Sequence, residues 1–117
     1  MARFVKGDVV IIPFPFSDLT QAKRRPALVL APLKGDDLIL CQITSQQIKD
    51  SYSISLNHSD FNSGTLRQQS NIRPNRIFTA DKKIVLYKIG DLKQSKVDES
   101  ILKIIEILKG VPRKGLN

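Results

Sequence analysis

The sequence has 117 residues, of which 41% are hydrophobic and 26% are charged, with only 6 glycines and 6 prolines. This length suits one domain with a modest core, and the composition excludes a disordered or fibrous chain. Lys and Arg number 19 against 11 Asp and Glu, which gives a formal net charge of +8. This charge favours a polyanionic partner, and nucleic acid is a better candidate than an anionic membrane surface.

The first half of the sequence predicts strands at residues 7–13, 26–31 and 37–43. In the first of these segments β-branched residues follow a Gly-Asp turn signal, and Pro13 is expected to end the pairing. Residues 15–23 are expected to form the loop that follows. The other two apolar runs are too short for helices, and the Lys-Gly-Asp turn at 34–36 joins them as a hairpin of central strands.

The second half of the sequence predicts strands at residues 52–56, 70–79 and 83–89. The first of these segments alternates between apolar and polar residues, which is typical of a half-exposed strand, and residues 57–65 are expected to form a loop. Pro74 interrupts the second segment, and a proline cannot donate to a strand ladder. We therefore expect a strand edge or a bulge at this point.

The apolar residues change to a helical period near the end of the sequence. The residues that line one face of the expected helix are Val97, Ile101, Ile104, Ile105 and Leu108. Ser95 and Asp98 have the spacing of a capping box at its start, while Gly110 and Pro112 are expected to stop it.

Short strands followed by one amphipathic helix indicate a mainly β (α+β) fold, a small antiparallel barrel with the helix packed against it. We expect one domain over residues 1–110 and a basic tail over 111–117. No apolar run approaches the roughly 18 residues that span a bilayer, and prolines break the early apolar run, so a cytoplasmic protein without a membrane role is expected. The single cysteine, Cys41, cannot form an internal disulfide, and one Cys with one His is too few for a structural zinc site.

Arg24 and Arg25 stand directly before Pro26, at the start of a buried strand. Proline biases the preceding residue toward an extended conformation, which holds the Arg25 backbone in place. The hairpin brings the start of one strand beside the end of the other, so Arg25 and Thr44 are expected to reach a common phosphate. A guanidinium and a hydroxyl that converge on one point make a phosphoryl-binding site. The alternative is that both arginines are solvated charges and Thr44 is a turn former.

Several segments, taken in this order, resemble the PemK/MazF family of toxin ribonucleases: GDVVIIPFPFSD, KRRPALVL, the strand ending in QITS, SNIRPNRIFTAD and the terminal helix. The similarity runs over residues 6–109. It implies an SH3-like barrel that forms a homodimer and cuts single-stranded RNA, often mRNA, at short motifs without a metal or other cofactor. It also implies a partner antitoxin whose extended segment covers the RNA groove.

The resemblance further implies that Arg25 acts at the scissile phosphate and that Thr44 supplies the hydroxyl beside it. The other residues that it suggests for RNA binding or catalytic support are Arg24, Ser45, Ser70, Asn71, Arg73 and Asn75. In some relatives an aspartate at the position of Asn75 is thought to be the general base. An amide cannot accept a proton usefully, so this departure leaves the base unassigned.

Two other functions fit part of the sequence. A non-catalytic RNA-binding barrel would use the positive charge equally well, and a toxin of the CcdB type would bind a protein target but would leave Arg25 and Thr44 without a role. Phe14, Phe16 and Phe61 are candidates for stacking on bases, although packing in the core or a dimer is the preferred interpretation of the first two.

Overall fold

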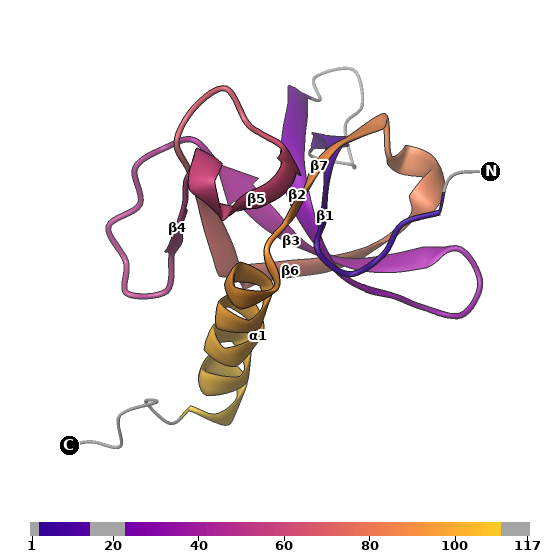
Figure 1. Ribbon diagram of the computed structural model, residues 1–117. Coiled ribbons are helices and arrows are strands. Elements are labelled where there is room, and N and C mark those ends of the chain that lie inside the picture. The colour runs from indigo at the N-terminus through magenta and orange to yellow at the C-terminus, as the bar shows by residue number, and fades with distance from the viewer. Residues whose placement is uncertain (1–2, 15–22, 111–117) are drawn as a thin grey trace.

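The computed structural model describes residues 3–14 and 23–110 (Figure 1). The elements are β1 (Asp8–Phe14), β2 (Lys23–Pro32), β3 (Asp37–Thr44), β4 (Ile54–Leu56), the 3-10 helix η2 (His58–Asp60), β5 (Phe61–Gly64), β6 (Ser70–Asp81), the 3-10 helix η3 (Lys82–Ile84), β7 (Tyr87–Leu92) and α1 (Gln94–Lys109). The strands form one sheet in the order β4-β6-β3-β2-β1-β7-β5, and every pairing is antiparallel. The predicted mainly β fold with a C-terminal helix is confirmed.

The sheet curls into a half-barrel. Strands β4 and β5 occupy opposite ends of the strand order, yet only η2 and its cap separate them along the chain. Figure 1 shows that this short connection draws the two edges of the sheet toward each other. The curled sheet therefore has an inner and an outer face, and both faces carry apolar residues.

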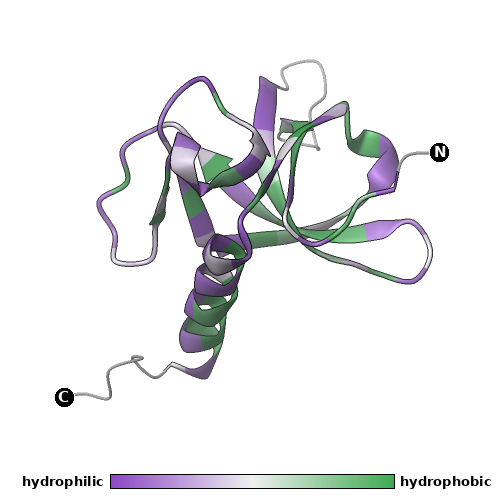
Figure 2. Cartoon of the chain, in the orientation of Figure 1, coloured by the Kyte–Doolittle hydropathy of each residue, from purple (hydrophilic) through white to green (hydrophobic). Residues whose placement is uncertain are grey.

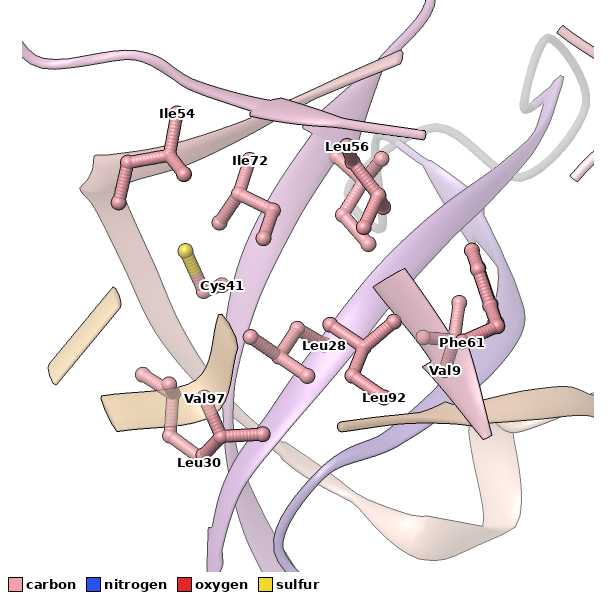
Figure 3. Close-up of a cluster of buried hydrophobic side chains, with 11 residues drawn as sticks. Val9, Leu28, Leu30, Cys41, Ile54, Leu56, Phe61, Ile72, Leu92 and Val97 are labelled. Carbon is pink, nitrogen blue, oxygen red and sulfur yellow. The ribbon is translucent and has the colours of Figure 1, made fainter. Parts of the chain in front are cut away.

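Alternating residues of the central strands supply two cores, one on each face. The first core contains Val9, Leu28, Leu30, Cys41, Ile43, Ile54, Leu56, Phe61, Ile72, Leu92 and Val97 (Figure 3). The second core contains Val10, Ile12, Ala27, Val29, Leu38 and Leu40. Since β2 and β3 are buried on both faces, their sequences are continuous apolar runs rather than alternating ones.

Helix α1 covers the first core with part of its apolar face. Val97 is fully buried, and Ile101 and Ile104 pack against the first core, whereas Ile105 is 40% exposed and Leu108 is 76% exposed. The apolar stripe is visible along the helix in Figure 2. The predicted apolar face is thus only partly covered by the sheet. Among the described residues, no helix is both long and apolar enough to cross a membrane.

The predicted C-terminal end of the helix is confirmed, but the helix begins at a different residue from the one predicted. Gly110 has a left-handed φ of 68°, and its N–H donates to Glu106 and Ile107, as expected for a C-terminal glycine. The capping-box prediction for Ser95 is wrong, because the N-cap is Lys93, which makes no side-chain cap. Pro112 and the predicted tail over 111–117 lie outside the described residues.

Three strand predictions need correction. β1 continues through Pro13 to Phe14, because β7 pairs only with residues up to Ile11 and leaves that side of the strand end without a ladder. The segment 57–65, expected as a loop, contains η2 and β5. The strand expected at 83–89 begins later, because η3 and the residues after it turn the apolar Ile84 and Val85 onto the second core.

Two further boundaries differ from the prediction. β4 is shorter than the expected 52–56 strand, and Tyr52 lies outside it and is 41% exposed. Lys23, expected in the loop over 15–23, is the first residue of β2, and the rest of that loop lies outside the described residues.

Of the two alternatives expected at Pro74, a strand edge or a bulge, the structure has the bulge. Cys41 pairs with Ile77, whereas the next residue, Gln42, pairs with Arg73, so β6 carries the extra residues 74–76. The bulge takes the Arg73 carbonyl out of the regular ladder, and the Cys41 thiol donates to that oxygen at 2.9 Å. Bulges bend a strand and redirect its side chains, and this one lies beside the end of β3.

Candidate nucleic-acid interface

Arg25 and Thr44 lie opposite each other on the paired strands β2 and β3. Ala27 pairs with Gln42, and this register, continued by two residues, sets Arg25 against Thr44. Side chains alternate along a strand, so both residues share the face of Ala27 and Gln42. Opposed residues of an antiparallel pair lie about 4.5–5.5 Å apart between Cα atoms, which is within reach of one phosphate.

The Thr44 hydroxyl is held in one place by the start of the next loop. Its oxygen accepts a hydrogen bond from the Gln46 backbone N–H at 3.2 Å, and the residue is 7% exposed. The hydroxyl still has its own proton to donate. Arg25 is half-buried and, within residues 3–14 and 23–110, has no ion pair. Within the described ranges, a fixed donor and a cation without an ion pair thus oppose each other.

Two residues of β6 extend this surface by one strand. Asn71 pairs with Thr44 and Arg73 pairs with Gln42, so their side chains share the same face. We call the surface formed by Arg25, Thr44, Asn71 and Arg73 the arginine face. It crosses three adjacent strands at the end where β3 stops.

The loop over residues 45–53 is tied to the arginine face by polar contacts. The Asn71 amide donates to the Gln46 carbonyl at 3.1 Å. The Arg73 guanidinium pairs with the Asp50 carboxylate, with 3.2 Å between Nη2 and Oδ2, and the Arg73 side chain is only 14% exposed. Each contact joins β6 to the loop that follows Thr44, so the loop is anchored to the arginine face at two points, Gln46 and Asp50.

Asp50 also organises the loop itself. Its Oδ1 accepts hydrogen bonds from the backbone N–H groups of Tyr52 and Ser53, each at 3.0 Å. Partial burial would raise the pKa of the Asp50 carboxyl, but these N–H groups and the Arg73 guanidinium together lower it below its ordinary value. The carboxylate is therefore ionised and paired at neutral pH.

Other residues considered from the sequence do not share this face. Arg24 pairs with Pro13, and alternation turns its side chain to the opposite side from Arg25. Ser70 is 3% exposed, donates to the Gln68 carbonyl, and lies on the side of the first core. Ser45 is exposed just beyond the end of β3.

An open pocket of about 410 Å³ lies beside the arginine face. Its lining residues are Phe14, Gln42, Asn75, Arg76, Ile77 and Phe78. Asn75 and Arg76 belong to the bulge of β6 and form the exposed rim. Gln42 links the pocket to the arginine face, because it lies two residues before Thr44 on the same face of β3.

Sequence reasoning missed Gln42 and Asp50. A polar residue inside the apolar run DLILCQIT was a signal for Gln42, because a side chain in a buried strand must find a polar partner. Asp50 carried no signal, since its importance comes from a contact with a residue 23 positions later in the chain.

Three other residues behave as ordinary parts of the fold. Cys41 is fully buried in the first core. Phe61 also packs in the first core and is 7% exposed. The His58 ring nitrogen Nδ1 lies 2.9 Å from the Thr65 hydroxyl, and His58 belongs to η2.

Residues 5–108 match the model of one protein family, described as PemK-like, MazF-like toxin of type II toxin-antitoxin system. No curated protein matches the sequence.

Solved structures of the same fold exist. MazF from Deinococcus radiodurans superposes with a TM-score of 0.73 at 19% identity, over 93% of this chain and 99% of that one. An endoribonuclease in complex with its cognate antitoxin, from a Mycobacterial species, has a TM-score of 0.67 at 14% identity, over 96% and 98%. The Mycobacterium tuberculosis toxin MazF-mt6 has a TM-score of 0.67 at 16% identity, over 90% and 98%. At these identities the likeness establishes the fold.

Proposed function

The chain belongs to the family of PemK-like, MazF-like toxins of type II toxin-antitoxin systems, and from this premise we propose that it is a metal-independent endoribonuclease that cuts single-stranded RNA at the arginine face. One observation carries the proposal. A half-buried arginine and a fixed hydroxyl, Arg25 and Thr44, oppose each other on one face of paired strands.

The proposed reaction needs few protein groups. The 2′-hydroxyl of RNA loses its proton and attacks the adjacent phosphorus, and the bond from phosphorus to the 5′-oxygen breaks. The products are a 2′,3′-cyclic phosphate and a 5′-hydroxyl, which takes up a proton. Because the nucleophile belongs to the substrate, the protein mainly holds the phosphate in line and stabilises charge on its oxygens.

Arg25 and Thr44 have complementary roles in this reaction. The Arg25 guanidinium can give two parallel hydrogen bonds to phosphate oxygens. The Thr44 hydroxyl, whose oxygen is already held by Gln46, donates its proton to the same group. Arginine is too basic to act as an acid or base here. The proposal assigns no general base, since position 75 is an asparagine.

Asn71, Arg73 and Asn75 take supporting roles in the proposal. Asn71 and Arg73 hold the loop over 45–53 beside the scissile phosphate, through their contacts with Gln46 and Asp50. Asn75, on the rim of the neighbouring pocket, contacts the RNA next to that phosphate.

The proposal includes a cognate antitoxin and a second copy of the chain as partners, and a cytoplasmic location. Three of the similar solved structures are complexes: one of an endoribonuclease with its cognate antitoxin and two of MazF with MazE. The net charge of +8 supports RNA and acidic segments as ligands of this surface. Exposed apolar residues on α1, among them Leu102, Ile105 and Leu108, support a contact with another protein surface.

The proposal is tested by incubating purified protein with a long single-stranded RNA in EDTA. We expect chelator-resistant fragments that end in cyclic phosphate. Arg25→Ala is expected to abolish them, while Arg24→Ala, the same change one residue away on the opposite face, is expected to lose far less activity. RNA that stays intact with wild-type protein would overturn the proposal and leave the non-catalytic RNA-binding barrel as the better function.

A further inference from the structure

Gln42, which lines the pocket beside the arginine face, has a buried oxygen without a hydrogen-bond partner in the described part of the chain. Among the described residues, no group donates a hydrogen bond to Oε1 of Gln42, although solvent does not reach this atom. Buried acceptors in folded proteins are almost always satisfied, because an unsatisfied one destabilises the fold. An exception beside a candidate site suggests that a ligand supplies the missing donor.

A second unpartnered atom lies on the neighbouring strand. Gln42 is the register partner of Arg73, and both side chains share one face. The Arg73 Nε–H is also buried and, in the part of the chain that is described, has no acceptor. An acceptor and a donor therefore stand side by side on paired strands. Of these two residues, Gln42 is the one that lines the pocket.

The walls of the pocket suit a flat aromatic ligand. Phe14 and Phe78 have ring centroids 6.0 Å apart, with 43° between the ring planes. Both line the pocket together with the amide of Asn75. Its volume of about 410 Å³ lies within the range of about 300–1,000 Å³ that is usual for small-molecule sites. Proteins hold unstacked bases by stacking them on aromatic side chains or guanidinium planes and by hydrogen bonds to the base edges.

We propose that this pocket binds one nucleobase of the RNA substrate and that Gln42 reads its hydrogen-bonding edge. The inference rests on the proposed function, and it adds a specificity-determining residue to the phosphate site. Residues two apart on a strand are about 6.5–7 Å apart, so a phosphate at Thr44 and a base at Gln42 belong to the same or adjacent nucleotides.

The test compares cleavage-site profiles. A long single-stranded RNA of known sequence is cut by wild type, by Gln42→Met and by the matched control Gln94→Met, which makes the same change on the exposed first turn of α1. Sequencing of the new 5′-hydroxyl ends gives the base preference at each position. We expect Gln42→Met to lose roughly 10-fold of the preference at one nucleotide position and to keep the others. A profile equal to that of wild type and the control would overturn the proposal.

Stability gives an independent readout for the same variant. Methionine preserves the length of the Gln42 side chain and removes the unsatisfied oxygen, so Gln42→Met is expected to unfold at the same or a higher urea concentration. A loss of base preference combined with a clear loss of stability would indicate a merely structural role. If Gln42→Met is insoluble, Asn75→Ala on the exposed rim is expected to weaken the preference at the same position, and an unchanged profile would count against the pocket.

Substrate changes separate this inference from the proposed function. An abasic nucleotide at the preferred position is expected to slow wild-type cleavage roughly 10-fold or more and to have little effect on Gln42→Met. Equal losses of cleavage rate in both proteins would overturn the assignment of this pocket as a base-binding site, without affecting the proposed ribonuclease function. If wild type cuts no RNA, the proposed function fails. The base-binding pocket can then still be tested by the binding of 2′-O-methyl oligonucleotides that carry or lack the base. Wild type should bind the two oligonucleotides with different affinities, and Gln42→Met should not.

Discussion

The Arg73 guanidinium and the Asp50 carboxylate, 23 residues apart in the sequence, form an ion pair that fixes the loop over 45–53 to strand β6. The same carboxylate uses its other oxygen to hold the N–H groups of Tyr52 and Ser53. One side chain therefore has two separable tasks, since an asparagine preserves the acceptor oxygen and removes the charge.

For this reason, Asp50→Asn is expected to keep the amide protons of Tyr52 and Ser53 protected from exchange, while Asp50→Ala is expected to expose them. Both variants lose the ion pair with Arg73, so both should reduce RNA cleavage. Hydrogen exchange followed by NMR distinguishes the two tasks. Equal protection in Asp50→Ala and wild type would show that the carboxylate does not hold the turn.

The Asp50 pKa is lowered in the folded protein, so its stabilising effect is present above the ordinary value near 3.8 and is lost as the pH falls through the lowered value. The ion pair with Arg73 is therefore expected to persist throughout the neutral range and to break only in acid, below pH 3.8. A carboxyl titration followed by NMR would check this. A midpoint above 3.8 would contradict it.

Thr44 allows a test that separates its hydroxyl from its shape. Thr44→Val keeps the volume and removes the donor, so cleavage is expected to fall on the order of 100- to 1000-fold, as when one donor to a reacting oxygen is removed. Thr44→Ser keeps the donor and should retain most of the activity. Rates on a short single-stranded RNA in EDTA measure both effects, and a fully active valine variant would remove Thr44 from the reaction.

Asp8 is a buried carboxylate, 1% exposed, that holds the turn before β1. Its Oδ2 accepts from the Val5 N–H at 2.9 Å, and Lys88 Nζ lies 3.1 Å from Oδ1 without the geometry of a hydrogen bond. Lys88→Met leaves this carboxylate without its cation and is expected to cost about 1–3 kcal/mol. The double variant with Asp8→Asn should recover part of that loss. Urea unfolding of the four proteins gives the coupling energy, and strict additivity would contradict the pairing.

Burial raises the pKa of the Cys41 thiol to about 12, while the contact with the Arg73 backbone opposes this. The folded chain thus keeps its thiol proton at a pH where the unfolded chain loses it. The contribution of the protonated thiol to the free energy of unfolding is fully present below pH 9. It should fall between pH 9 and 12 by up to about 1.4 kcal/mol per pH unit. Unfolding of wild type and Cys41→Ala over this range isolates the effect, and parallel curves would contradict it. A thiol reagent at pH 8 should modify only unfolded protein.

Two glycines with positive φ are expected to differ in their tolerance of alanine. A Cβ on Gly64, where φ is 72°, would overlap the Ile89 carbonyl in the β5–β7 pair, whereas a Cβ on Gly35, where φ is 83°, would meet nothing within 4 Å. Gly35→Ala should therefore cost only the backbone strain of about 1–2 kcal/mol. Gly64→Ala should cost about 3 kcal/mol or more, because the strands must separate. Similar midpoints in urea for both variants would contradict this difference.

The sequence predicted the central strands and the opposition of Arg25 and Thr44 because both follow from local signals. Continuous apolar runs predict β2 and β3, and the turn at Gly35 sets their register. The short β5, with the sequence FNSG, has no such signal, since it forms only by pairing with β7 across the curled sheet. Tertiary contacts, and not the β-propensity of its residues, determine that strand.

The pocket and the loop anchor were beyond prediction for a related reason. The length of the bulge in β6 decides that Gln42 lies opposite Arg73, and a proline indicates that a bulge occurs without fixing how many residues it contains. The predicted start of α1 was wrong. Ser95 and Asp98 have the spacing of a capping box, but packing of Val97 against the sheet sets the position of the first turn.

Strand β1 lies between β2 and β7, so during synthesis the second edge of β1 stays unpaired until β7 has been made. At about 5–20 residues per second, the chain between Phe14 and Tyr87 takes several seconds to be translated. A polypeptide that ends between Arg73 and Tyr87 would already contain the side chains of the arginine face but would lack β7, the second partner of β1. Synthesis that stops early would therefore be expected to release fragments that do no harm to the cell.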